Sequence, residues 1–267
     1  MDRRNFLKTG GIALLGSLAT GSAMALTTPG ALGGEGADKK AAVALAMNHF
    51  GVSEADLKKV LAAALEKGGD YADLFFEHTI SNSIRLMDGA VNNSYSNIDY
   101  GVGVRVLIGD QSGYAYVENI TVEDMLKAAR TAARIASANK GNKPLNLTEK
   151  ELKKNYYTVA SPWEEVSLKD KMPYLQKLND RIFALDKRVH KVQASQSDTT
   201  SHIFFCNSEG VMFYDYRPMV TLGAVCIMEE DGKTENGYAA RAYRRGFDFL
   251  SDEVVDVIAR EAVDQTS

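Results

Sequence analysis

The sequence contains few of the residues from which metal and catalytic centres are usually built. Its 267 residues include only four histidines, His49, His78, His190 and His202. No two of them have the spacing of three to five residues that places two metal ligands on one turn of a helix. The histidine pattern therefore predicts no zinc site, and each histidine is expected to be solvated or locally hydrogen bonded. Glu77-His78 is the pair of most interest, because it ends an expected strand.

Common catalytic motifs are missing as well. The sequence has neither a Gly-x-Ser-x-Gly nucleophile elbow nor a Gly-x-x-x-x-Gly-Lys-Ser/Thr phosphate loop. Gly101-x-Gly103 begins like a dinucleotide-binding fingerprint, but the third glycine is replaced by Val106 and the expected strand continues. Carboxylate pairs such as Glu164-Glu165 lie at expected turns or helix starts, where solvation and the helix dipole explain them. We therefore predict no catalytic residue in this chain.

Cysteine is scarce too, with only Cys206 and Cys226. Both lie in expected strands, which we take to be neighbours. A disulfide requires their Cα atoms to lie within about 7 Å with suitable Cβ directions, and a sequence does not reveal this. The sequence therefore leaves two readings open, a disulfide or two buried small hydrophobic side chains.

The chain has no excess of basic residues. Its formal net charge is −4, and the first 25 residues contribute +2 through Arg3, Arg4 and Lys8 against Asp2, so the remainder carries −6. An acidic chain without a clustered basic stripe is a poor electrostatic match to a phosphate backbone. We expect no nucleic-acid partner.

No apolar run approaches the roughly 20 residues that span a bilayer. Residues 2–8 instead form a nearly complete twin-arginine signal around Arg3-Arg4, followed by a short apolar run and the small-residue cleavage pattern Ala23-Met24-Ala25. We expect residues 1–25 to be a signal peptide. The mature protein should be exported, soluble in the periplasm or another extracytoplasmic compartment, and free of the membrane after cleavage.

Hydrophobic periodicity predicts an α+β fold of mostly antiparallel meanders flanked by helices. The expected organisation has a flexible leader at residues 26–38, a helix and antiparallel-sheet domain at residues 39–138, a polar linker at residues 139–152, and a helix plus long-strand region at residues 153–267. Helices are expected to begin after the N-caps Ser53, Thr121, Ser167 and Ser251. Short strands are expected at residues 71–77, 83–87, 90–95, 189–196, 202–207, 211–216, 220–229 and 233–243. Those at 83–87 and 90–95 are expected to form a hairpin about Asp88-Gly89.

Residues 99–116 form the stretch around which the other elements are expected to be arranged. They read as a hairpin across the turn Gly109-Asp110-Gln111-Ser112-Gly113, with β-branched residues on one face of the first strand. The other face carries Gly103 and Arg105, so either another strand or an extended ligand approaches it closely. We take Gly101, Gly103 and Arg105 as candidate substrate-binding residues.

Four segments, taken in order, resemble the TldD/PmbA family, also called modulators of DNA gyrase. They are Asp70-Tyr71-Ala72-Asp73-Leu74-Phe75-Phe76; Gly101-Val102-Gly103-Val104-Arg105 with Gly109-Asp110 and Gly113-Tyr114-Ala115-Tyr116; Asp186-Lys187-Arg188-Val189; and Arg217-Pro218 with Glu229-Glu230-Asp231-Gly232-Lys233. The similarity runs from about Leu57 to the last residue and is nearer the TldD branch.

The resemblance implies a metallopeptidase that cuts peptides or unfolded chains held in an extended form, often as a pair of related subunits. It also implies zinc or a similar divalent ion, held in a complete member by a His-Glu-x-x-x-His helix and a later cysteine, which performs metal-assisted hydrolysis. This chain ends before that motif, and Cys206 and Cys226 do not match the family's ligand. We therefore expect no cofactor in this chain and no catalytic activity from it alone.

Two functions remain open after the sequence. The chain is either the substrate-holding or scaffolding half of an exported TldD-type metallopeptidase, or a non-catalytic binding subunit that docks on a catalytic relative. The expected partners are an extended peptide or unfolded polypeptide, captured by strand pairing, and a homologous subunit in a homo- or hetero-oligomer. Export makes a role on gyrase improbable.

Overall fold

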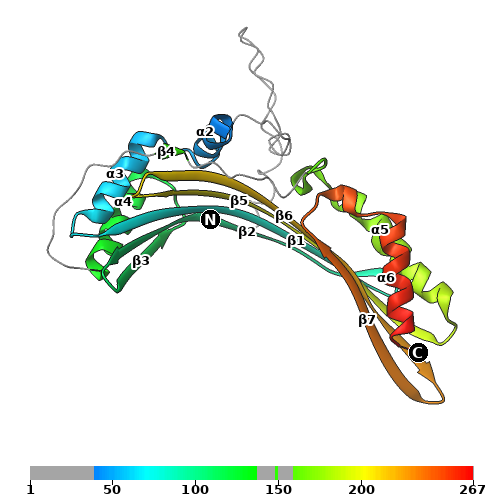
Figure 1. Cartoon of the computed structure of the whole chain (residues 1–267). Helices are drawn as coiled ribbons and strands as arrows, with labels where there is room; N and C mark the ends of the chain where they lie inside the picture. The colour runs from blue at the N-terminus through cyan, green and yellow to red at the C-terminus, as the bar shows by residue number, and fades with distance from the viewer. Residues whose placement is uncertain (1–38, 137–147, 150–158, 267) are drawn as a thin grey trace, which may run out of the picture.

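A single bent sheet runs through the part of the chain that the structure, a computed structural model, describes: residues 39–136, 148–149 and 159–266 (Figure 1). The strand order is β3-β2-β1-β5-β6-β4, and β7 also pairs with β6. All pairings are antiparallel except the two-residue pairing of β4 with β6. The strands are β1 (Tyr71–Met87), β2 (Ala90–Ile108), β3 (Gln111–Val117), β4 (Thr148–Glu149), β5 (Val189–Asn207), β6 (Val211–Glu230) and β7 (Lys233–Tyr243). The predicted α+β class is confirmed.

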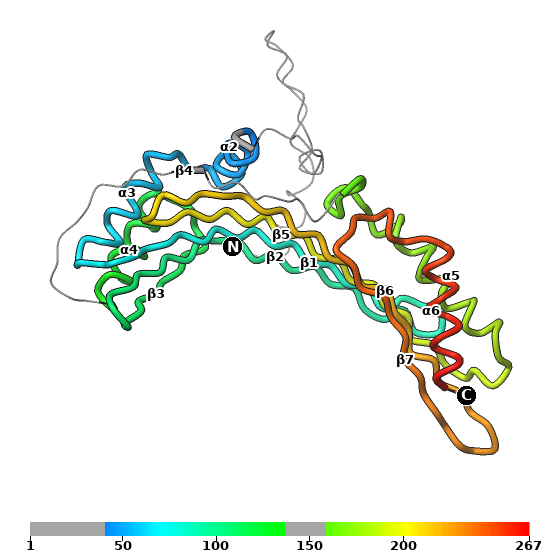
Figure 2. Tube along the Cα trace, viewed as in Figure 1, coloured from blue at the N-terminus to red at the C-terminus, as the bar shows by residue number. Residues whose placement is uncertain are grey.

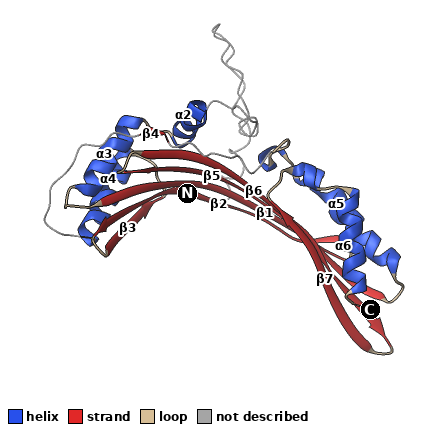
Figure 3. Cartoon of the chain, viewed as in Figure 1, coloured by secondary structure: helices blue, strands red, loops and turns tan. Residues whose placement is uncertain are grey.

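The helices cover one face of this sheet in two groups (Figures 1 and 3). One group packs near one end of the long strands, the other near the opposite end, and α2 lies between them over β5 and β6. The α-helices are α2 (Lys39–Phe50), α3 (Glu54–Leu65), α4 (Val122–Ile135), α5 (Leu168–Leu185) and α6 (Asp252–Asp264), with 3-10 turns η2 (Trp163–Glu165) and η3 (Phe247–Phe249). The opposite face of the sheet carries no described helix.

Local sequence starts the helices at the predicted caps. Ser53 accepts a hydrogen bond from the Asp56 backbone N–H, and the Asp56 carboxylate accepts one from the Ser53 N–H, which completes a capping box. Thr121 accepts the corresponding hydrogen bond from the N–H of Asp124. Each such cap stabilises its helix by about 1 kcal/mol.

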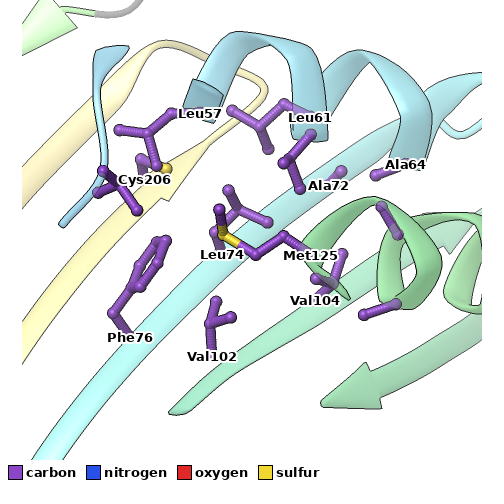
Figure 4. Close-up of a cluster of buried hydrophobic side chains, with 14 of the residues drawn as sticks. Leu57, Leu61, Ala64, Ala72, Leu74, Phe76, Val102, Val104, Met125 and Cys206 are labelled. Carbon is purple, nitrogen blue, oxygen red and sulfur yellow. The ribbon is translucent and has the colours of Figure 1, made fainter. Parts of the chain in front are cut away.

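Two hydrophobic cores lie under the two helix groups. In the first, Leu57 and Leu61 of α3 and Met125 of α4 pack on Leu74 of β1 and Val104 of β2 (Figure 4). The second core joins α5 and α6 to β5, β6 and β7 and includes Trp163, Leu178 and Leu222. Each fully buried leucine contributes about 1.5–3 kcal/mol. Every strand that crosses both cores is thereby fixed at its two ends.

The strands are longer than the sequence predicted. Residues 71–87 form one strand rather than two, and the breaks expected in β2, β5 and β6 are likewise absent. Polar side chains at these positions pair across strands instead of forming turns: the hydroxyls of Thr79 and Ser201 lie 2.8 Å apart, and Asn82 Nδ2 donates to Asp198 Oδ1 at 2.9 Å. Only Asp88-Gly89, where φ is positive at both residues, makes the predicted hairpin turn in this region.

Pro218 lies inside β6, in the gap between the strands that the sequence predicted at residues 211–216 and 220–229. The last β6–β7 pair is Val220 with Tyr243, so β6 has its β5 partner at Pro218 but no β7 partner. A proline is tolerated where one side of a strand is an edge, because no ladder hydrogen bond is lost there. The long path of these strands between the two helix groups can be followed in Figure 2.

The two cysteines are free thiols that belong to different cores. Cys206 lies in the first core opposite Met212, and Cys226 lies in the second core opposite Val192. Of the two readings left open by the sequence, the structure shows buried thiols.

Several predicted segments lie outside the described residues. They are the signal peptide at residues 1–25, the leader at residues 26–38 and most of the linker at residues 139–152, of which only Thr148–Glu149 is described, as β4. The predicted ranges 39–138 and 153–267 contribute strands to one continuous sheet. Within the described ranges, no helix is long and apolar enough to cross a membrane.

Candidate functional site

The outer side of β2 is open along half of its length. β3 pairs with β2 only at residues 102–108, so residues 90–101 have β1 on one side and no described strand on the other. We call residues 90–101 the open edge. From Ala90 to Tyr100 every residue is exposed. Alternate residues of such an edge direct unpaired N–H and C=O groups outward, which is a template for another strand.

The open edge lacks the features by which proteins usually protect a sheet edge. Its sequence, AVNNSYSNIDYG, contains no proline and no lysine, and its only charged residue is Asp99. It also exposes large apolar side chains, among them Tyr95 and Ile98. Exposed strand edges of this kind are normally shortened, charged or covered, since they otherwise pair with other chains. An unprotected edge of this kind can pair with a strand of another chain.

A cavity of about 500 Å³ adjoins the open edge at the point where β3 ends. Gly101 and Gly103 of β2, Phe75 of β1, and Tyr114 and Tyr116 of β3 line it. Three carboxylate residues line it as well: Glu77, Asp99 and Glu118. Register places Gly103 opposite both Phe75 and Tyr116, so this wall lies on the face of the sheet away from the helices.

Gly101 and Gly103 allow β3 to approach β2 closely. A Cβ at Gly101 would lie 2.5 Å from the Val117 carbonyl oxygen, and a Cβ at Gly103 would lie 2.5 Å from the Tyr114 hydroxyl. Glycine is the residue that tolerates such an approach. The sequence left open whether a strand or a ligand fills this space, and the structure places β3 there. Both glycines also line the cavity, and their binding of substrate stays a prediction.

Arg105 lies on the same face but does not line the cavity. Its Nη2 and Nε donate to Asp73 Oδ2 at 2.6 and 2.9 Å, and its guanidinium lies 6.0 Å from the centre of the Tyr71 ring. The hydrogen bond to Asp73 raises the pKa of Arg105. Because Asp73 compensates this charge, the structure assigns Arg105 a pairing partner within the sheet, and its contact with substrate stays a prediction.

Three histidines converge on the other face, which the sequence did not foresee. His49 Nε2 at the end of α2 lies 2.8 Å from His78 Nδ1 on β1, and the His49 ring stacks on the His202 ring of β5 at 4.5 Å between centres. His202 Nδ1 lies 2.7 Å from the Tyr214 hydroxyl, and its Nε2 lies 3.0 Å from Glu164 Oε1. We call these five residues the histidine cluster. Only the register of His78 opposite His202, together with the docking of α2, brings them together.

Two histidines of the cluster, His49 and His78, have lowered pKa values that favour their neutral imidazoles. Loss of water around the ring, followed by the neighbouring His202 and His78, lowers the pKa of His49 to about 4. Burial is also the main cause that lowers the pKa of His78. Burial opposes ionisation of Glu164, but hydrogen bonds from His202 and Tyr216 outweigh it and hold the pKa of Glu164 below its usual value. The contact between the neutral His49 and His78 rings is therefore sensitive to acid.

The cluster does not fit a metal ion. Among the described residues, no three histidine, cysteine, aspartate or glutamate side chains are arranged to hold one. Both ring nitrogens of His202 are engaged, by Tyr214 and by Glu164. No step of metal chemistry is therefore assigned to side chains that the structure describes.

Two family models match two successive segments of this chain. Residues 72–136 match the model for PmbA/TldA metallopeptidase domain 1, and residues 161–267 match the model for the PmbA/TldA metallopeptidase central domain. A Metalloprotease TldD homolog of Haemophilus influenzae is 32% identical over 206 residues, which are 73% of this chain and 42% of the relative. A metalloprotease of Methanocaldococcus jannaschii is 24% identical over 198 residues, which are 71% of this chain and 42% of that protein.

Solved structures share the fold. A candidate modulator of a DNA gyrase from Thermotoga maritima superposes with a TM-score of 0.63 at 19% identity, covering 80% of this chain and 47% of that one. TldE from Thermococcus kodakarensis superposes with a TM-score of 0.56 at 16% identity, covering 78% and 46%. The chain thus spans less than half the length of these relatives. On the two family models and the TldD homologue together, the chain belongs to the PmbA/TldD metallopeptidase family.

Proposed function

We propose that this chain is the substrate-holding part of an exported TldD-type metallopeptidase and that it captures extended peptides or unfolded polypeptide by adding them as a strand to the open edge. The observation that supports this proposal is the open edge itself. Residues 90–101 have no described partner strand on their outer side, and every residue from Ala90 to Tyr100 is exposed. Backbone pairing recognises any extended chain, because the hydrogen bonds do not depend on its side chains. Such binding suits a protease of unfolded substrates.

The geometry sets the size of the segment that is captured. Twelve residues of an antiparallel strand extend about 40 Å, at about 3.4 Å per residue. β1 holds the inner side of β2 in continuous register from Met87 to Tyr71, with one irregularity at Arg85/Leu86. The edge is therefore supported by a central strand and is presented ready for pairing, which lowers the entropic cost of binding.

Hydrolysis is proposed for complete members of the family and not for the residues described here. Relatives named metalloproteases imply a metal in complete members, and that ion would polarise the scissile carbonyl and activate a water molecule. What this chain's own residues supply is capture and orientation of the extended backbone. Export by the twin-arginine pathway is proposed on the motif around Arg3-Arg4.

A second candidate function is supported by the apolar side chains on the same edge. Val91, Tyr95 and Ile98 are more than half exposed, and a homologous catalytic subunit could cover them by strand pairing. In that case the chain is a non-catalytic subunit that docks on its relative. The two candidates differ in the occupant of the edge, a transient peptide or a permanent partner strand.

Peptide binding to the purified 267-residue chain tests the proposal. Fluorescence anisotropy would compare an unmodified extended peptide with two versions methylated on alternate backbone nitrogens. One methylated series should lose binding and the other keep it, because only alternate N–H groups of a paired strand face its neighbour. Equal binding by both series would refute strand addition.

Two matched variants test whether the peptide binds at the open edge. Ile98→Lys adds a cation to the open edge, while Ile135→Lys adds one to an equally exposed position on α4, at 61% and 58% exposure. Ile98→Lys should weaken peptide binding at least tenfold, and Ile135→Lys should leave it unchanged. A stable complex with a homologous subunit that is lost in Ile98→Lys, without any peptide binding, would favour the docking alternative.

A further inference from the structure

The cavity beside the open edge has its own chemistry, which the proposed strand capture does not use. It lies where β3 ends, so a peptide that pairs with residues 90–101 continues the line of β3 directly past it. Side chains of a strand alternate between its two faces. Every second side chain of the captured peptide therefore points to the face of the sheet on which the cavity opens.

Aromatic rings form one wall of this cavity. Tyr114 and Tyr116 of β3 are exposed at 58% and 66%, and Phe75 of β1 is exposed at 38%. Register places Tyr116 and Phe75 on either side of Gly103, with the Tyr114 hydroxyl above that glycine. Exposed aromatic faces around a small space bind apolar groups and also attract cations through the ring quadrupole.

Three carboxylates also line the cavity, alongside further residues of β2, and no described cation neutralises them. Glu77 accepts a hydrogen bond from the Thr79 hydroxyl at 2.7 Å, and Asp99 accepts one from Asn97 Nδ2 at 3.1 Å, so the described donors to both are neutral. Glu118 is the third of these carboxylates, and no arginine or lysine lines the cavity. Arg105, the cation of the neighbouring row, is paired with Asp73.

Aromatic faces and uncompensated carboxylates together select one kind of side chain. An uncharged apolar group would satisfy the rings but not the carboxylates, and an acidic group would be repelled. The long stem of lysine or arginine packs on apolar surface while its charged end reaches polar groups. We infer that this cavity is a specificity pocket for a lysine or arginine side chain of the captured polypeptide, an inference that rests on the proposed strand capture.

A peptide series measures the preference directly. Labelled extended peptides of identical sequence would carry lysine, arginine, norleucine or glutamate at one central position, with anisotropy as the readout. Lysine and arginine should bind about five- to tenfold more tightly than norleucine, and glutamate most weakly. The preference over norleucine should shrink as salt rises from 50 to 500 mM, because the rim is solvent exposed.

Substitutions of the carboxylates that line the cavity test whether it is the source of the preference for lysine and arginine. Combined Asp99→Asn and Glu118→Gln should bring the affinities of the lysine and norleucine peptides to within twofold of each other. Asp110→Asn, in the turn between β2 and β3, removes an exposed carboxylate outside the cavity and should keep the preference. Glu118→Lys should improve binding of the glutamate peptide.

The outcomes separate the two proposals. If all four peptides bind alike in the unaltered protein, the specificity pocket is refuted and strand capture stands. A preference for lysine that survives the Asp99→Asn and Glu118→Gln pair also refutes the pocket. If no peptide of the series binds, the proposed function fails and this inference fails with it.

Discussion

His49 Nε2 and His78 Nδ1 face each other at 2.8 Å and join the end of α2 to the middle of β1. A hydrogen bond between two imidazole nitrogens requires that one nitrogen carries a proton and the other does not. Full protonation of both rings therefore breaks the contact. His202 of β5 stacks on His49 and also lies 3.0 Å from Glu164 of η2, so the contact of His49 with His78 adjoins the contact between β5 and η2.

Acid should destabilise the protein through this cluster. The folded-state pKa of His49 is about 4, against 6.5 for an unperturbed histidine, and the pKa of His78 is lowered too. The unfolded state thus binds more protons between pH 6.5 and 4, so the free energy of unfolding falls as pH drops through that window. Below about pH 4.5, Glu164 adds to the loss, because its folded-state pKa is lowered.

Urea unfolding at pH 7.5, 6.5, 5.5 and 4.5 measures this dependence. His49→Gln should flatten the slope by about 1 kcal/mol across the window, after allowing for solvent screening of a partly exposed ring. His190→Gln is the matched control, because His190 is exposed and lies outside the cluster, 3.7 Å from Glu229. A slope that is the same in the unaltered protein and in His49→Gln would contradict the prediction.

Loss of the buried ion pair under α5 should be the costliest single polar change. Lys171 Nζ lies 2.5 Å from Asp198 Oδ2, both side chains are almost fully buried, and Gln196 and Asn82 also donate to Asp198. Lys171→Met leaves the carboxylate buried without its cation, so the free energy of unfolding should fall by about 3–5 kcal/mol.

Two further variants test whether this loss of stability comes from the uncompensated buried charge. Adding Asp198→Asn to Lys171→Met should recover part of the stability, since the uncompensated charge is then removed. Lys177→Met breaks only an exposed pair with Asp252 and should cost less than about 1 kcal/mol. Equal losses for Lys171→Met and Lys177→Met in urea unfolding would show that the buried pair has no special weight.

The two thiols should be unreactive in the folded protein. Burial raises the pKa of both Cys206 and Cys226, and the negative charge of Asp73 adds to the effect at Cys206. Because the thiolate is the reactive form, Ellman's reagent should label neither cysteine at pH 7.5 in buffer and both in 6 M urea. Labelling of only one thiol after unfolding, without reductant, would indicate a modified cysteine.

The sequence correctly predicted those elements whose signals are local. The caps Ser53 and Thr121 and the turn Asp88-Gly89 depend on residues within a few positions, and all three lie where they were predicted. Strand continuity was not predictable in this way. Serine, threonine and asparagine in β1 and β5 read as turn formers, yet cross-strand partners such as Thr199 for Ser81 keep them extended.

The candidate sites could not be predicted from the sequence, because they depend on the register of the sheet. The open edge exists because β2 is 19 residues long and β3 only seven, and neither length follows from local periodicity. The histidine cluster needs His78 opposite His202, 124 positions later in the chain, with α2 docked above them. The sequence did single out Gly101 and Gly103, because a glycine inside a strand is a local anomaly that marks a close approach.

Gly101 and Gly103 should respond differently to alanine, because the atoms that crowd them differ in mobility. At Gly101 the added Cβ meets the backbone of Val117 and Glu118, whereas at Gly103 it meets the end of the exposed Tyr114 side chain. Gly101→Ala should therefore cost about 1–3 kcal/mol, the usual range for overpacking, and displace the end of β3. Gly103→Ala should cost less than about 1 kcal/mol, since the Tyr114 ring can rotate away into solvent. Urea unfolding gives the two costs, and hydrogen exchange of the β3 amides should accelerate in Gly101→Ala only. If Gly103→Ala lowered the free energy of unfolding more than Gly101→Ala, the Tyr114 side chain would be held rigidly. Glycine would then be required at the cavity wall rather than where the backbone of β3 approaches β2.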